Sequence, residues 1–253
     1  MLRSILSVFI AWLLLCSSGV YAAATAPRES DSSNVQSSDP MAERARACAA
    51  CHGAEGRAAA DGYYPRLAGK PAGYLYHQLR NFAEGRRHYT LMTGLLDNLS
   101  DDYLHALANY FSSLDLPYAA PPAAKADARV LARGEELVRR GDKALELPAC
   151  ERCHGKSLTG VAPDIPGLLG LPADYINAQL GGWRTGQRST PQPDCMARIA
   201  RHLQLSDISA VARWLASQPV PDARTRALSQ ATAVDQKISN MQSLKEYRCA
   251  SAP

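Results

Sequence analysis

Two stretches decide the fold: Cys48-Ala49-Ala50-Cys51-His52 and, about a hundred residues later, Cys150-Glu151-Arg152-Cys153-His154. In a Cys-x-x-Cys-His run the two thiols add across the two vinyl groups of one haem, and the adjacent imidazole becomes the proximal ligand of the iron. A Cys-x-x-Cys pair alone would also fit a redox dithiol or half a zinc site, but zinc needs two more nearby soft ligands, which neither stretch has. The sequence therefore predicts two covalently bound haem c groups.

The surroundings of the two motifs are repeated as well. Residues after the first motif recur after the second at a displacement of 101 residues, and residues further on recur at 104. The matched pairs are Pro65 and Pro166, Tyr74 and Tyr175, Gln78 and Gln179, Leu79 and Leu180, Phe82 and Trp183, Gly85 and Gly186, then Met92 and Met196, Leu99 and Leu203, Leu107 and Val211, Ala108 and Ala212, and Tyr110 and Trp214. Such steady displacements indicate a tandem duplication.

Helical periodicity dominates both copies and predicts an all-α protein. Residues 41–47 run without Gly or Pro into the first motif, which places its thiols at the C-terminal end of a helix. Leu104, Leu107 and Phe111 form one apolar stripe of a helix that begins after Ser100. The predicted parts of the chain are a signal peptide (1–24), a disordered leader (25–40), a first repeat (41–116), a Pro- and Ala-rich linker (117–128), a second repeat (129–220) and a C-terminal extension (221–253).

The N-terminal segment has the pattern of a secretory signal. Arg3 gives it a positive start, residues 5–16 are largely apolar, and small residues near 20–24 offer a cleavage site. A membrane span needs about 20 consecutive apolar residues, and serines interrupt this stretch, although an uncleaved anchor stays open as the alternative. The Ser-, Asp- and Pro-rich leader that follows is typical of disorder. We therefore expect an exported protein.

The composition limits the classes of function. The formal net charge of +4 is small and no concentrated basic run is present, which argues against a nucleic-acid-binding protein. The chain has only three Phe and three Trp, so the porphyrins are expected to supply much of the large apolar surface of each core. Without haem, the chain is expected to fold poorly.

The ligand on the opposite face of each iron separates an electron carrier from a catalyst. Met92 and Met196 match in the two repeats and are the only methionines between each motif and the end of its repeat. An iron held by His on one face and by a Met thioether on the other has no open position, and the soft sulfur favours the reduced state. The predicted axial pairs are His52 with Met92 and His154 with Met196. The alternatives are a core-filling role for each Met, or ligation by His88 or His202.

Two further needs of a haem site have candidates in the sequence. The proximal imidazole must donate its second N–H to an acceptor, which the carbonyl of Pro65 or Pro166 could provide, although each could be an ordinary loop proline. Haem propionates pair well with guanidinium and phenol groups. The candidates are Arg66, Arg87, Arg188, Tyr74 and Tyr175, with solvated surface or core packing as the alternative for each.

Together these motifs resemble the two-haem cytochrome c4 group of class I c-type cytochromes, over about residues 41–220. The resemblance is carried, in chain order, by Cys-Ala-Ala-Cys-His-Gly, Tyr-Pro-Arg-Leu-Ala-Gly, Tyr-Leu-x-x-Gln-Leu, Phe-x-x-Gly-Arg-Arg, a Met and Leu-Ser-Asp-Asp. It implies two tandem, all-helical cytochrome c domains that face each other around a pseudo-twofold axis. It also implies a periplasmic carrier that feeds a terminal oxidase or accepts electrons from a quinol-cytochrome c reductase or dehydrogenase.

The expected function is therefore the transport of single electrons, not catalysis. The alternative is a cytochrome subunit that stays docked in a membrane-associated dehydrogenase or oxidase and uses the same chemistry, so peripheral membrane association remains open. A dihaem peroxidase needs one five-coordinate iron, which two matched methionines disfavour.

Two cysteines remain after the haem sites and the signal, Cys195 and Cys249. Free thiols are uncommon in an oxidising compartment, so these two are a candidate disulfide that would bring the extension back over the second repeat. Two separate thiols are the alternative, since the geometry of a bridge cannot be read from a sequence.

Overall fold

A computed structural model of the chain describes residues 40–59, 63–123 and 126–222. All of them belong to one compact unit. The predicted signal, the leader except for its last residue, and the C-terminal extension beyond its first two residues lie outside the described residues, and so does Cys249. Within the described part, no helix is both long and apolar enough to cross a membrane.

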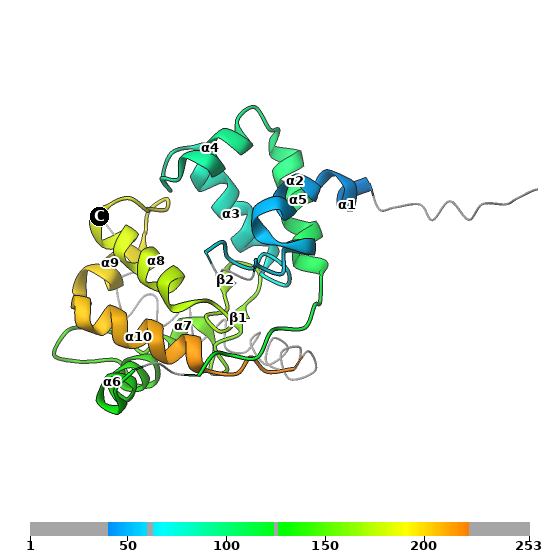
Figure 1. The fold of residues 1–253 in the computed structure, drawn as a ribbon. Helices are drawn as coiled ribbons and strands as arrows, with labels where there is room; N and C mark the ends of the chain where they lie inside the picture. The colour runs from blue at the N-terminus through cyan, green and yellow to red at the C-terminus, as the bar shows by residue number, and fades with distance from the viewer. Residues whose placement is uncertain (1–39, 60–62, 124–125, 223–253) are drawn as a thin grey trace, which may run out of the picture. The chain divides into compact units, whose positions relative to one another are not determined.

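The first repeat consists of helices and loops in its described residues, as predicted (Figure 1). Its elements are α1 (Pro40–Arg44), α2 (Arg46–His52), the short 3-10 helix η1 (Ala54–Gly56), α3 (Ala72–Ala83), α4 (Thr90–Leu96) and α5 (Asp101–Ser113). Because the first haem motif ends α2, its thiols lie at the C-terminal end of a helix. Gly53 follows at φ 74°, and a Cβ there would lie 2.4 Å from the carbonyl oxygen of Ala58, so this turn requires glycine.

The second repeat has the same order of helices and adds a two-stranded ribbon. Its elements are α6 (Ala128–Arg139), α7 (Glu151–His154), β1 (Gly160–Val161), β2 (Ile165–Pro166), α8 (Ala173–Thr185), α9 (Cys195–His202) and α10 (Leu205–Ser217). The strands are antiparallel, with Val161 opposite Ile165. Helical periodicity does not predict this ribbon, because strands of two residues are too short to show alternation.

The predicted apolar stripe of the first repeat forms its core. Leu104, Leu107 and Phe111 of α5 are buried, and α5 packs against α3. Ser100 caps α5, because its side chain accepts a hydrogen bond from the backbone N–H of Tyr103. The predicted start of this helix is therefore confirmed.

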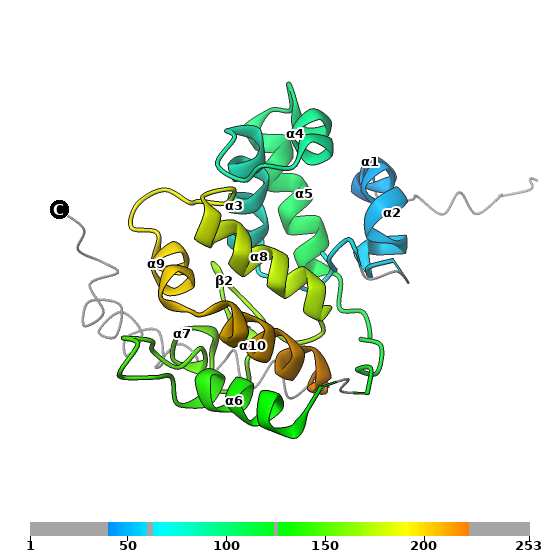
Figure 2. The ribbon, with the colours of Figure 1, turned by 60° about the vertical axis from the view of Figure 1, so that its left-hand side comes forward.

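In the second repeat, α6 and α10 lie side by side in both views (Figures 1 and 2). Leu137 and Val138 of α6 and Leu215 of α10 are almost fully buried. The two helices approach closely at Gly134, where a Cβ would lie 2.2 Å from the carbonyl oxygen of Ala210. The missing side chain at Gly134 therefore permits this packing.

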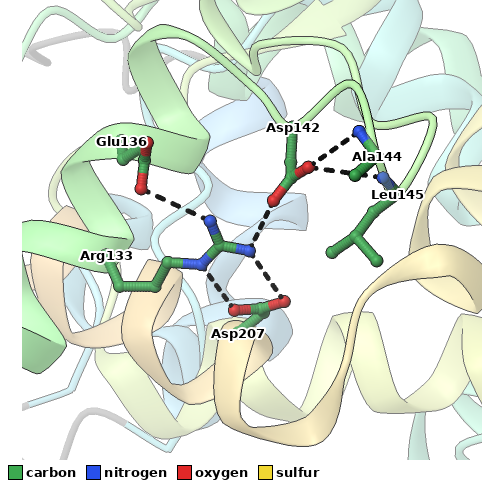
Figure 3. Close-up of polar contacts among 6 residues, drawn as sticks. All are labelled: Arg133, Glu136, Asp142, Ala144, Leu145 and Asp207. Carbon is green, nitrogen blue, oxygen red and sulfur yellow. Dashed lines mark hydrogen bonds and ion pairs between the residues drawn. The ribbon is translucent and has the colours of Figure 1, made fainter.

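Arg133 of α6 joins three acidic side chains (Figure 3). Its Nε donates to Asp207 of α10 at 2.9 Å, and its Nη2 donates to Asp142 at 2.8 Å. Its Nη1 donates to Glu136 at 3.3 Å. Asp142 also accepts hydrogen bonds from two backbone N–H groups of the loop that leads to the second haem motif. The guanidinium thus connects this loop to both long helices, and it lowers the pKa of the Asp142 carboxyl.

Replacing Gly134 by Ala should destabilise the second repeat. The new methyl group would overlap the backbone of α10, and overpacking of this kind costs about 1–3 kcal/mol. Urea unfolding of the holoprotein, followed by circular dichroism, measures the loss.

The matched control is Gly181→Ala on α8, where nothing lies within 4 Å of the added Cβ. Because Ala favours helix over Gly, this variant should be as stable as the wild type or slightly more stable. Equal stability of the Gly134→Ala variant and the wild type would mean that the two helices can separate without cost.

Replacing Arg133 by Met should destabilise the protein at pH 7 and leave it nearly unchanged in acid. The folded-state pKa of Asp142 is lowered, so its contribution to stability is present above the unfolded pKa of about 4 and is lost as the pH falls through the lower folded value. Thermal unfolding between pH 3 and pH 7 measures the difference.

Arg129→Met removes the same charge from an exposed position of α6 and serves as the control. A stability difference between Arg133→Met and the wild type that stayed constant down to pH 3 would show that packing, and not the ion pairs, is responsible.

Candidate haem-binding sites

Each predicted proximal histidine is bonded to a proline carbonyl. His52 Nδ1 lies 2.7 Å from the carbonyl oxygen of Pro65, and His154 Nδ1 lies 2.8 Å from that of Pro166. A carbonyl can only accept, so Nδ1 carries the proton in both rings and the lone pair of Nε2 is left for a metal. The predicted role of the two prolines as acceptors is confirmed.

Both imidazoles are kept neutral by their surroundings. Each ring belongs to a residue that is 7% exposed, and burial lowers the pKa of both. The proline carbonyls act in the opposite direction, and the charges of Arg87 and Lys70 lower the pKa of His52 and His154, respectively, further. A neutral ring with a free Nε2 is the form that binds iron.

The first thiol of each motif faces apolar surroundings. Cys48 packs against the core cluster of α3 and α5, and Cys150 packs against the larger cluster of the second repeat. Burial raises the pKa of Cys48, and it raises that of Cys150 to about 12. Redox-active dithiols have a lowered pKa, so this environment disfavours a dithiol and fits thiols that form thioethers.

The two methionines lie on matching helices. Met92 is in α4 and packs against Phe82, Leu96 and Leu104, while Met196 is in the first turn of α9 at the edge of the larger cluster. Both are half-buried. Their assignment as iron ligands stays a prediction.

The alternative ligands His88 and His202 have other surroundings. His88 is exposed, and its backbone N–H donates to the carbonyl oxygen of Gln187. His202 Nδ1 lies 2.9 Å from the carbonyl oxygen of Leu145, so this ring holds the loop before the second haem motif.

A reciprocal cluster of two arginines and two glutamines joins the repeats. Arg87 donates to Gln78 at 3.1 Å and to Gln179 at 2.6 Å, and Arg188 donates to the same two oxygens at 2.8 Å each. The backbones of Arg87 and Arg188 pair as an antiparallel bridge. Because each arginine bonds its own glutamine and that of the other repeat, the contact has the form of a twofold interface.

This cluster carries positive charge without carboxylates. Among the described residues, neither Arg87 nor Arg188 forms an ion pair with an acidic side chain. Arg188 is 5% exposed, and burial followed by the charge of Arg87 lowers its pKa. Two buried N–H groups, Nε of Arg188 and Nε1 of Trp183, also have no hydrogen-bond acceptor among the described residues. Unpaired cations and spare donors fit a group with carboxylates, such as a haem with its propionates.

Two other residues have roles that the sequence analysis did not assign. Arg66, a candidate for a propionate, instead donates to the backbone carbonyls of Leu116 and Pro117 and holds the start of the linker. Lys70 is buried and donates to the carbonyl oxygen of Gly167 in the other repeat. The matching of Gln78 with Gln179 was the available signal for the interface, whereas nothing in the sequence pattern pointed to Lys70.

Comparison with known proteins agrees with this geometry. Residues 43–115 match the family model for cytochrome c. The chain is 42% identical over 176 residues to the thiosulfate dehydrogenase electron acceptor of Thiomonas intermedia, which covers 70% of this chain and 80% of the relative. It is 38% identical over 174 residues to cytochrome c4 of Pseudomonas aeruginosa, which covers 68% of this chain and 84% of the relative.

The fold agrees as well. The crystal structure of reduced cytochrome c4 from Pseudomonas stutzeri matches with a TM-score of 0.60 and 32% identity over 70% of this chain and 96% of the other. The predicted all-α fold of two tandem class I cytochrome c domains with two covalently bound haem c groups is confirmed. The chain therefore belongs to the cytochrome c family, in which it is a two-haem electron carrier of the cytochrome c4 group and not an enzyme.

Proposed function

We propose that the chain is a periplasmic carrier of single electrons whose haems are held by its duplicated residues. The thioether attachments are Cys48 and Cys51 in the first repeat and Cys150 and Cys153 in the second. The axial ligands are His52 with Met92 and His154 with Met196. The observation that carries the proposal is the matched bond from a buried imidazole Nδ1 to a proline carbonyl, at 2.7 Å and 2.8 Å.

The protein residues restrict this site to electron transfer. Haem iron, when bound, exchanges one electron between its ferric and ferrous states. Pro65 and Pro166 fix the ring orientation of the two histidines and leave Nε2 to bind. Met92 and Met196 would supply the second ligand of each iron and so leave no position open for a substrate.

Arg87 and Arg188 are the proposed partners of the haem propionates. Both lie in the cluster between the repeats and lack acidic partners among the described residues. The Trp183 indole N–H is a further donor in the second repeat, where the first repeat has Phe82. If these groups hold the propionates, the propionate edges of both haems would lie near the interface, which would suit electron transfer between them.

The proposed donor is a dehydrogenase, and the proposed acceptor is a terminal oxidase. A relative from Thiomonas intermedia that is 42% identical carries the name thiosulfate dehydrogenase electron acceptor, which supports a donor of this class. A quinol-cytochrome c reductase is the other donor to test. The proposal also covers the parts of the chain. They are an export signal (1–24), two domains (41–116 and 129–220), a linker between them (117–128) and a C-terminal extension (221–253).

A free carrier and a permanently docked subunit predict different behaviour on isolation. The free carrier should be released with the periplasmic fraction without detergent and should elute from a size-exclusion column as a haem protein without other subunits. Elution together with a dehydrogenase or oxidase, or release only by detergent, would favour the subunit of a membrane-associated complex.

Replacing Met92 or Met196 by Ala should open one iron while leaving its haem attached. Attachment depends on the thiols, so denaturing electrophoresis should still show two haems per chain. The open iron should bind cyanide or carbon monoxide, its potential should fall, and the charge-transfer band of Met-ligated ferric haem should lose half its intensity.

Met92→Leu and Met196→Leu separate ligation from packing. Leu keeps the apolar volume and lacks the sulfur, so a methionine that only fills the core would be replaced without effect on the spectrum. Retention of the full charge-transfer band in a Leu variant would show that the methionine at that position is not the ligand.

A further inference from the structure

Lys70 connects the loops that hold the two proximal histidines. It lies five residues after Pro65, whose carbonyl accepts the His52 bond. Its side chain crosses to the second repeat, where Nζ lies 3.3 Å from the carbonyl oxygen of Gly167. Gly167 directly follows Pro166, whose carbonyl accepts the His154 bond. A lysine of the first repeat therefore carries its charge to the proximal loop of the second.

This lysine is buried without a counter-charge. Lys70 is 5% exposed, and among the described residues no carboxylate is paired with it. Lysine is almost never fully buried unless it is paired, so the position needs a reason. A cavity of about 30 Å³ beside Lys70, Gly167 and Thr159 has room for a water that could accept a further hydrogen bond from the ammonium group. A water there would solvate the charge locally, while the burial of Lys70 limits its screening by bulk solvent.

The symmetry of the repeats makes Lys70 distinctive. Its counterpart, 101 residues later, is the apolar Leu171, and the counterpart of Gly167 is Arg66. The reciprocal contact from the second repeat to the first is therefore missing. In contrast, Arg87 and Arg188 are matched and shared by both repeats.

From this geometry we infer that Lys70 raises the reduction potential of the haem held by the second repeat. The inference rests on the proposed function, in which His154 ligates that haem. Oxidation of the iron adds a positive charge close to the proximal loop, and a buried cation there opposes it through a medium of low dielectric constant. The positive charge of Lys70 in the first repeat thus favours reduction of the haem in the second repeat.

Spectroelectrochemical titration of the holoprotein, resolved into two one-electron steps, tests the inference. The reduction step of the second haem is identified as the one whose potential changes in the Met196→Ala variant. Lys70→Met and Lys70→Gln should lower this step by a threefold to tenfold change in its equilibrium constant, where tenfold corresponds to 59 mV for one electron. The step of the first haem should move much less.

Four comparisons make the result specific. Lys70→Arg keeps the charge and should keep the potential, whereas Gln keeps a donor for Gly167 and should behave like Met. Lys143→Met removes an exposed charge from the second repeat and should leave both steps in place. The shift in the Lys70 variants should also persist at high salt, because a buried charge is screened little.

An unchanged second step in Lys70→Met and Lys70→Gln, or an equal shift of both steps, would overturn the inference. A Gln variant that kept the wild-type potential while Met lost it would show that the hydrogen bond, and not the charge, is responsible. Failure of the proposed function looks different, because the wild type itself would then lack two Met-ligated haem steps.

Discussion

The bond from a proximal histidine to a proline carbonyl is the constraint on which each half of this protein depends. It fixes the tautomer and the plane of the ring. The two repeats reach it by different routes: η1 lies between His52 and Pro65, whereas the β1–β2 ribbon follows His154 and ends at Pro166. The resulting distances differ by a tenth of an ångström. The loops can therefore vary in structure as long as they return the carbonyl to the same place.

The interface between the repeats depends on charge in an unusual way. Two guanidinium groups lie together and share the oxygens of two glutamines, which are neutral and cannot cancel the repulsion. On the proposal that propionates supply the missing negative charge, haem binding and the docking of the repeats stabilise each other. A chain that carries only one haem would then keep part of this repulsion. The stability of the contact between the repeats would therefore depend on whether both haem sites are filled.

Local features of this structure were predictable and long-range contacts were not. The haem motifs, the repeat, the capped stripe of α5 and the proline acceptors are short-range patterns with a clear chemical requirement. The bonds of Arg133 to Asp207 and of Lys70 to Gly167 span 74 and 97 residues and follow no period. Arg66 shows why residue type alone is not enough. An arginine suits a haem propionate, but in the fold the guanidinium of Arg66 donates to a backbone carbonyl at the start of the linker. Residue type predicts what a side chain can bind, and only the fold decides which partner is near.

Backbone hydrogen bonds also cross between the repeats. The N–H of His88 donates to the carbonyl of Gln187, and the N–H of Ser189 donates to the carbonyl of Arg86, at 2.9 Å and 2.7 Å. Every residue type except proline supplies the same donor and acceptor at such positions. These two contacts therefore depend on the backbone and not on the side chains of the four residues. These backbone bonds place little demand on sequence, whereas the adjacent cluster of two arginines and two glutamines requires specific side chains, so the two halves are held by contacts of both kinds.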